Sequence, residues 1–193
     1  MEDIQDLKNS LTEEEFKKKL VDLKFIIAKN TKEFKEKAGL ASNVWNPGYS
    51  IQIPDTLSDI EEKAFEYCFC LTYLYIPDSV TSIKDWAFYG CSNLLSTNIP
   101  DSVKEIGECA FGHCSNLTSI TIPESIKYIR YNAFESCNSL SNISIPDSVI
   151  NIENYAFSGC KNLTLITIPK RFKSRLNVIF GFVELSDIEI IFT

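Results

Sequence analysis

Several kinds of residue are scarce in this 193-residue chain, which has one histidine, one methionine and seven glycines. A single histidine without fixed acid and nucleophile partners does not assemble into a catalytic triad. With so few glycines, the chain also has no Gly-x-x-x-x-Gly-Lys loop, the motif that cradles phosphates. We therefore expect no enzymatic activity and no cofactor.

The chain also lacks long apolar stretches. No apolar run approaches the roughly 20 residues of a membrane span. The N-terminal stretch MEDIQDLKNSLTEEEFKKK is charged and lacks the apolar core of a secretory signal. We expect no membrane insertion and, if this is the whole protein, a cytosolic location. Seven cysteines are an odd number for a disulfide framework, so reduced thiols are expected.

Positive charge is in deficit over most of the chain. Residues 1–40 carry nine lysines and nine acidic side chains, which cancel. Residues 41–169 carry six basic and fourteen acidic side chains, for a net charge of −8, whereas the remainder has a net charge of +1. Nucleic-acid binding needs a basic face for phosphate contacts, so we expect no nucleic-acid partner.

What the chain does have is a repeat of 23 residues. The consensus motif of the repeat is I-P-[DE]-[ST]-[VIL]-x-x-I-x-x-x-A-F-x-x-C-x-x-L. The landmarks are the prolines 54, 77, 100, 123, 146 and 169, the Ala-Phe pairs at 64–65, 87–88, 110–111, 133–134 and 156–157, and the cysteines 68, 91, 114, 137 and 160. Each such cysteine is followed three residues later by leucine. A fixed period of this length predicts a stack of identical structural units.

The spacing L-x-x-I-x-I within each repeat is typical of a leucine-rich repeat. In LTSITIP (117–123), Leu117, Ile120 and Ile122 point to one core, with the period of two that indicates a strand. Short parallel strands are predicted near 51–53, 74–76, 97–99, 120–122, 143–145 and 166–168. The segment I-x-x-x-A-F-x-x-C is predicted to form a short helical turn on the convex side.

The repeat resembles the BspA-like, treponemal-type leucine-rich repeat family, whose motif IPDSVTSIKDWAFYGCSNL (76–94) and IPDSVKEIGECAFGHCSNLTSI (99–120) carry. The resemblance implies an α/β solenoid with parallel strands on the concave face. It also implies contact with other proteins. Since the family is similar to extracellular adhesins and protist surface proteins, a cell-surface location is the alternative to the cytosol.

The two ends of the chain differ from the repeat. Residues 1–45 are predicted to form a helical N-terminal cap, since a capping box at Thr12 precedes an apolar helix stripe. A partner-binding helix is the alternative. Residues 46–193 are predicted to form the solenoid, with about six rungs over 53–169 and a degenerate capping rung. That last rung keeps Leu185, Ile188 and Ile190, which predict a strand near 188–191.

The stretch CAFGHC (109–114) has the composition of a metal or thiol site. The repeat argues against both. Cys114 occupies the periodic cysteine position, predicted to be core, and Cys109 occupies a variable position, predicted to face outward. His113 falls at a position that tolerates Tyr, Gly or Ser. A zinc site needs about four convergent ligands, so no metal site is predicted here.

Two surface columns follow from the period. Acidic residues follow the first five repeated prolines, at Asp55, Asp78, Asp101, Glu124 and Asp147. Turn formation explains them, and an acidic ribbon for a basic partner or calcium is the alternative. On the concave face, uncharged polar and aromatic residues alternate with the core, a chemistry resembling that of paratopes. The predicted partner-binding residues are Gln52, Tyr73, Tyr75, Asn98, Thr121, Asn142, Ser144 and Thr167. The predicted function is non-catalytic binding of a protein partner by a monomer or weak homo-oligomer. The alternative is a glycan- or matrix-binding adhesin module.

Overall fold

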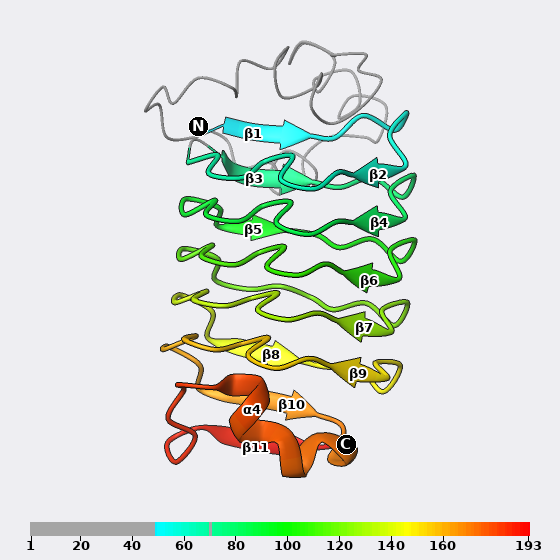
Figure 1. The fold of residues 1–193 in the computed structure, drawn as a ribbon. Helices are drawn as coiled ribbons and strands as arrows, with labels where there is room; N and C mark the ends of the chain where they lie inside the picture. Colours follow the sequence, from blue (N-terminus) through cyan, green and yellow to red (C-terminus); the bar gives the residue numbers. More distant parts are fainter. Residues whose placement is uncertain (1–48, 70) are drawn as a thin grey trace, which may run out of the picture.

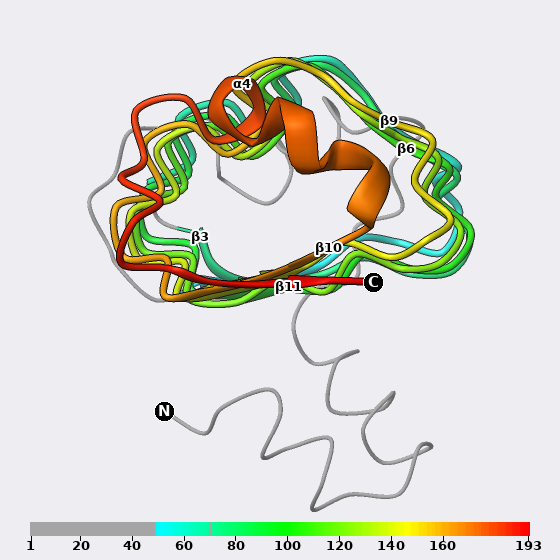
Figure 2. The ribbon, with the colours of Figure 1, turned by 90° about the horizontal axis from the view of Figure 1, so that it is seen from below.

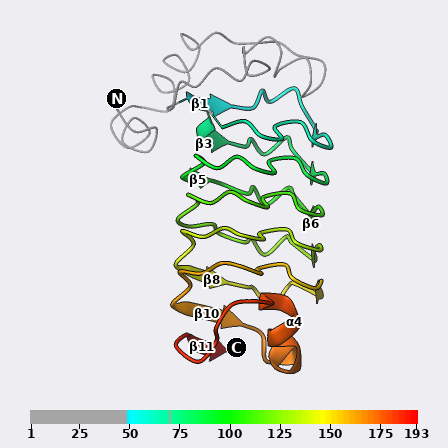
Figure 3. The same cartoon turned by 60° about the vertical axis from the view of Figure 1, so that its left-hand side comes forward.

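The chain folds as a parallel β-solenoid with little helix (Figure 1). The computed structural model describes residues 49–69 and 71–193. The helical cap predicted over 1–45 lies outside them, so it stays a prediction. We count rungs from the repeated proline: 54–76, 77–99, 100–122, 123–145 and 146–168, followed by a final turn over 169–193. Figures 1 and 3 show the rungs stacked in a nearly straight column.

One side of the column, which we call the long-strand face, carries the predicted parallel strands. They are β1 (Tyr49–Gln52), β3 (Leu71–Tyr75), β5 (Ser96–Thr97), β8 (Asn142–Ser144), β10 (Leu165–Ile168) and β11 (Glu189–Phe192). They pair in the orders β1-β3-β5 and β8-β10-β11. The strand predicted near 120–122 does not form. Ile120 and Ile122 are nevertheless buried there, so the third rung follows the same path without ladder bonds.

A second parallel sheet lies along another side of the column. Its strands are β2 (Asp59–Ile60), β4 (Ser82–Ile83), β6 (Glu105–Ile106), β7 (Tyr128–Ile129) and β9 (Asn151–Ile152), in that order. Each ends on the repeated isoleucine, which is buried. This sheet was not predicted, because strands of two residues are too short to show an alternating pattern of apolar residues.

The predicted helical turns at the Ala-Phe segments are wrong. Each segment is a series of turns with two residues of positive φ, one before Ala-Phe and one before the cysteine. These are Lys63, Tyr67, Trp86, Gly90, Cys109, His113, Asn132, Ser136, Tyr155 and Gly159. A left-handed residue cannot continue a right-handed helix. The segment instead bonds to the next rung: Phe65 donates its N–H to the Ala87 carbonyl at 2.7 Å, and Phe88 to that of Ala110 at 2.8 Å.

The core runs along the axis of the column. The phenylalanines of successive rungs stack as Phe65, Phe88, Phe111, Phe134, Phe157 and Phe180, with ring centroids 5.1–5.5 Å apart. The repeated cysteines lie beside them and are buried. In the second rung, Thr97 stands where the other rungs have an aliphatic core residue, and it is buried, with its hydroxyl donating to the Asn98 carbonyl at 3.3 Å.

The C-terminal end of the column is covered by helix. Figure 2 shows η1 (Lys170–Arg175) and α4 (Leu176–Phe180) running across the end of the stack. They bury Phe172, Ile179 and Phe180, which protects the end of the core as a solenoid requires. The final strand, β11, forms within one residue of the predicted span 188–191. No helix in the described part of the chain is long and apolar enough to cross a membrane.

Candidate functional site

The register of the long-strand face arranges its outward residues in two columns. In one column, Tyr73 pairs with Ser96, and the backbone of Tyr73 pairs on its other side with that of Ser50. In the other, Gln52 pairs with Tyr75. The two tyrosines are half-buried and lie on one strand, separated by the buried Leu74. They therefore lie two residues apart on the same strand, one in each column.

The columns continue at the C-terminal end of the face. Asn142 pairs with Leu165, and Ser144 with Thr167. Thr121, Asn142 and Ser144 are exposed, and Thr167 is half-buried. The final strand adds Glu189 beside Leu165 and Ile191 beside Thr167. These two residues extend the predicted surface. The sequence reasoning missed them because it treated the last strand as part of a capping rung.

The Asn98 side chain on this face bonds to the backbone of the neighbouring rung. Its side-chain oxygen accepts the Ile76 N–H at 2.9 Å, and its amide donates to the Ile76 carbonyl at 2.7 Å. These bonds take the place of backbone ladder bonds where β5 ends. Asn98 is half-buried as a result. Gln52 is also half-buried, and its side-chain oxygen has no hydrogen-bond partner among the described residues.

The CAFGHC stretch does not converge on one point. Cys114 is buried, as predicted, and its thiol donates to the Phe88 carbonyl at 3.3 Å. The outward orientation predicted for Cys109 is wrong, because this side chain is only 3% exposed. Its φ of 51° turns the side chain differently from an ordinary turn residue. His113 is exposed and packs its ring edge-on against Tyr89 at 5.1 Å.

Burial favours the protonated thiol at Cys109, Cys114, Cys137 and Cys160. It raises the pKa of Cys109 to about 11, with a further contribution from the carboxylates of Glu108 and Glu135. It raises the pKa of Cys160 to about 12 and lifts the pKa values of Cys114 and Cys137 well above the ordinary range. A nucleophilic or metal-binding cysteine needs a thiolate, which these environments disfavour. Within residues 49–69 and 71–193, no three His, Cys, Asp or Glu side chains gather as metal ligands would.

A row of aromatic rings on the Ala-Phe turns is a feature that the sequence reasoning missed. Tyr67 meets Tyr89 at 5.5 Å, Trp86 meets Tyr89 at 4.5 Å, and Phe69 meets Tyr67 at 5.9 Å. With His113, these rings span three rungs; we call them the turn-face rings. The signal was available, since large aromatics occupy the variable positions on either side of the repeated Ala-Phe pairs.

Glycines hold the turn-face rings in place. A Cβ on Gly90 would come within 2.5 Å of the Tyr67 ring, and one on Gly112 within 2.9 Å of the Tyr89 ring. Each ring therefore lies over the next rung, in space that a side chain there would fill. A side chain larger than glycine at either position would therefore displace the ring above it.

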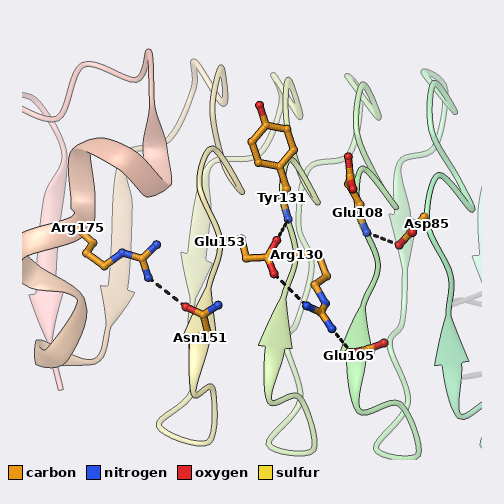
Figure 4. Close-up of polar contacts among 8 residues, drawn as sticks. All are labelled: Asp85, Glu105, Glu108, Arg130, Tyr131, Asn151, Glu153 and Arg175. Carbon is orange, nitrogen blue, oxygen red and sulfur yellow. Dashed lines mark hydrogen bonds and ion pairs between the residues drawn. The ribbon is translucent and has the colours of Figure 1, made fainter.

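The second sheet carries an ion-pair network (Figure 4). Arg130 donates to Glu153 at 3.0 Å and to Glu105 at 3.1 Å, which joins three rungs, and these hydrogen bonds raise its pKa. Its guanidinium also lies 5.5 Å from the centre of the Tyr128 ring. The other oxygen of the Glu153 carboxylate accepts the Tyr131 N–H at 3.0 Å.

Other polar contacts join neighbouring rungs along the same sheet. Asp85 accepts the Glu108 N–H at 2.7 Å, and Arg175 donates to the Asn151 side chain at 3.1 Å (Figure 4). A hollow of about 370 Å³ opens beside Gly107, lined by Glu61, Glu62, Ile83, Lys84, Asp85 and Glu105. Four acidic residues and one lysine line this hollow, so its lining has a net negative charge.

Comparison with known proteins places these features in a family. The family model described as the BspA type leucine-rich repeat region matches the chain in six copies, over residues 42–145 and 127–191. No curated protein matches the chain significantly.

Several solved structures are similar. A T. pallidum leucine-rich repeat protein is 33% identical over 62% of this chain and 58% of its own, with a TM-score of 0.61. A leucine-rich cell surface protein from Faecalibacterium prausnitzii A2-165 is 36% identical over 69% of this chain and 35% of its own, with a TM-score of 0.62. A leucine-rich repeat protein from Bacteroides ovatus is 29% identical over 74% and 45%, with a TM-score of 0.59. This chain thus spans less than two thirds of each of these proteins.

Proposed function

Because this chain belongs to the BspA-type leucine-rich repeat family, we propose that it is a non-catalytic protein-interaction module that binds its partner through the long-strand face. One observation carries the proposal: the register of β1, β3 and β5 aligns Gln52, Tyr73 and Tyr75 on one uncharged surface. Tyrosine supplies a large contact area at low entropic cost and is enriched among interface hot spots.

The remaining predicted residues have a supporting role in this proposal. Thr121, Asn142 and Ser144 are exposed and small, so they would shape the surface and supply hydrogen bonds. Asn98 is committed to the Ile76 backbone, and its contribution would be to keep β5 in register. The binding energy would therefore concentrate at the two tyrosines.

The test is capture of a partner by the full chain, followed by titration against variants. Tyr73→Ser and Tyr75→Thr copy Ser96 and Thr121, the residues of the same columns in later rungs. We expect the double variant to weaken binding by about 2 kcal/mol or more, the hot-spot threshold. Tyr131→Asn, on the Ala-Phe turns, is the matched control and should bind normally. Equal affinity of the double variant and the native chain would overturn the proposal.

A glycan- or matrix-binding adhesin module is the second candidate. It is favoured by the F. prausnitzii relative, which is described as a cell surface protein. Aromatic rings such as Tyr73 and Tyr75 would then stack on sugars. Binding of the intact chain to a glycan array, lost in the same double variant, would favour this candidate. The location that we propose depends on which of the two functions is correct. An adhesin would be at the cell surface, and a protein-interaction module in the cytosol.

A further inference from the structure

The hydrogen-bond ladder of the long-strand face is interrupted at the third rung. The strands β1, β3 and β5 form one sheet and β8, β10 and β11 another, and no strand of this face lies between β5 and β8 (Figure 1). Within the part of the chain that the structure describes, the backbone of 119–122 neither donates nor accepts a hydrogen bond. The bond from the Thr118 N–H to the Leu95 carbonyl, at 3.2 Å, is the last one before this segment. The long-strand face is therefore divided into two halves.

The sequence departs from the repeat just before the interruption. Thr97 stands where β10 has Ile166, and Asn98 stands where β10 has Thr167. The Asn98 side chain bonds to both backbone groups of Ile76, at 2.9 and 2.7 Å, so a side-chain amide replaces the peptide group of a strand there. Accordingly β5 ends at Thr97 after two residues, whereas β10 has four.

The core is slightly more exposed at the interruption than elsewhere along this face. The core side chains there are 5–8% exposed, namely Thr97, Ile99, Ile120 and Ile122. Their counterparts in rungs one, four and five are 0–4% exposed, namely Leu74, Ile76, Ile143, Ile145, Ile166 and Ile168. The strands are therefore less closely joined at the third rung, in agreement with the missing ladder bonds.

The other two sides of the column are continuous through the third rung. In the second sheet, β4, β6 and β7 pair without interruption. Arg130 reinforces that sheet by joining Glu105 of the third rung to Glu153 of the fifth. On the Ala-Phe turns, Phe111 of the third rung donates its N–H to the Ala133 carbonyl of the fourth at 2.8 Å. Two sides are thus bonded across the third rung, and the long-strand side is not bonded at 119–122.

We propose that the third rung is a hinge, about which the column bends to open and close the long-strand face. The second sheet and the Ala-Phe turns stay together, and the two halves of the long-strand face move relative to each other. Bending on this side breaks no hydrogen bond at 119–122 and exposes core residues that are already slightly exposed, so little opposes it. A hinge concentrates such a motion in a few residues, which here are 119–122.

Bending changes the distance between the two groups of predicted partner-binding residues. Tyr73 and Tyr75 lie on the first half, and Asn142, Ser144 and Thr167 lie on the second. A partner that contacts both halves would hold the hinge at one angle, whereas a partner of the tyrosines alone would leave it free. The hinge is a property of the free chain, so it goes beyond the proposed function and does not depend on it.

Distances between paired spin labels, measured by pulsed electron spin resonance on the full chain, test the hinge. Labels at Ser96→Cys and Glu189→Cys lie in one column of the long-strand face, on either side of the interruption and four rungs or about 20 Å apart. Labels at Ser58→Cys and Ile150→Cys have the same spacing beside the second sheet. All four positions are exposed. Cys70→Ser is present in every chain, and the native cysteines of the described residues are buried and so protected from the label.

We expect a broader distribution of distances for the long-strand pair than for the second-sheet pair. The second-sheet pair is the matched control, because it crosses the same rung on a bonded side. Equal widths for the two pairs would overturn the proposal.

Repair of the interruption is the second test. Thr97→Ile combined with Asn98→Thr copies Ile166 and Thr167, so the ladder should continue into the third rung. The distribution for the long-strand pair should then narrow to the width of the second-sheet pair. Amide exchange at 119–122, followed by NMR, should slow about two- to tenfold, the effect of one net hydrogen bond at each bonded amide. A repaired chain that is folded by circular dichroism and keeps the broad distribution would refute the assignment.

Ser144→Thr is the control for the repair, because it also copies Thr167 but lies in the second half, away from the interruption. It should leave the distribution broad. Should the repaired chain fail to fold, the two label pairs in the native background still decide the question. No partner enters these measurements, so the hinge and the proposed binding through the long-strand face fail separately.

Discussion

Each repeated cysteine is more than a small apolar residue. The thiols of Cys91, Cys114, Cys137 and Cys160 each donate to the carbonyl of the phenylalanine one rung earlier, at 3.0–3.3 Å. The bond satisfies a buried polar group that would otherwise cost free energy. A thiol is therefore suited to this position both by its size and by its single weak donor.

Raised thiol pKa values make the fold sensitive to alkali. The folded pKa of Cys160 is about 12, whereas an unfolded cysteine has a pKa of about 8.5. The stabilisation from keeping this thiol neutral is complete below about pH 8.5 and is lost as the pH rises toward the folded pKa. Each such thiol should lower the free energy of unfolding by about 1.4 kcal/mol per pH unit in this window.

Urea unfolding at pH 7.5 and at pH 10.5 measures this loss. Cys160→Ala removes one titrating group, so its free energy of unfolding should fall less between the two pH values than that of the native chain. The comparison cancels the titration of tyrosines and lysines that both proteins share. Equal losses in the two proteins would mean that the thiol ionises in the folded state.

At the scale of the element, the Ala-Phe turn depends on two left-handed residues in every rung. The residue before the cysteine is Tyr67, Gly90, His113, Ser136 or Gly159, none of them β-branched. Branched side chains are the least tolerant of positive φ, which explains their absence. This conformation turns the chain so that the Ala-Phe backbone bonds to the neighbouring rung instead of to itself.

Substitution at Ser136, whose φ is 56°, tests this requirement. Ser136→Val should destabilise the fold by about 1–3 kcal/mol, the cost of a strained backbone region. Ser136→Gly, which copies Gly90 and Gly159, should be neutral or slightly stabilising. Asn162→Val is the control, because it places valine at an exposed turn residue without positive φ. Melting temperatures decide the question: similar losses for the two valine variants would show that backbone conformation is not the cause.

At the scale of the whole molecule, stability comes from contacts between neighbouring rungs. The phenylalanine stack shows this, because Phe111 packs between Phe88 and Phe134, whereas Phe180 packs against Phe157. All of these rings are fully buried. A ring in the middle thus has two stacked neighbours in the series, and the last ring has one.

Leucine in place of phenylalanine should therefore cost more at Phe111 than at Phe180. The expected difference is about 0.5–1.5 kcal/mol, the value of one aromatic pair. Urea unfolding followed by circular dichroism measures it. In Phe180→Leu, loosening of the terminal turn should also broaden the transition, because end rungs can unfold separately. Equal losses at both sites would mean that the rings contribute through burial alone.

The predicted site shows which features can be read from the 23-residue period and which cannot. The position of a residue within the 23-residue repeat indicates on which side of the column it lies. Tyr73 and Tyr75 lie on the long-strand face, as their positions in the repeat predict. The period says nothing of contacts between rungs. The role of Asn98 in bonding the Ile76 backbone, and the burial of Cys109, follow from the local path of the chain and needed coordinates.

By itself, the sequence determined the period, the stacking and the main core, because identical rungs must bury identical positions. Only the tertiary structure revealed the second sheet, the left-handed turn residues and the turn-face rings, since each depends on hydrogen bonds and packing between rungs. A pattern within one repeat records which side chains are apolar. It does not record which groups on the next rung, 23 residues away, will bond to its backbone or lie under its rings.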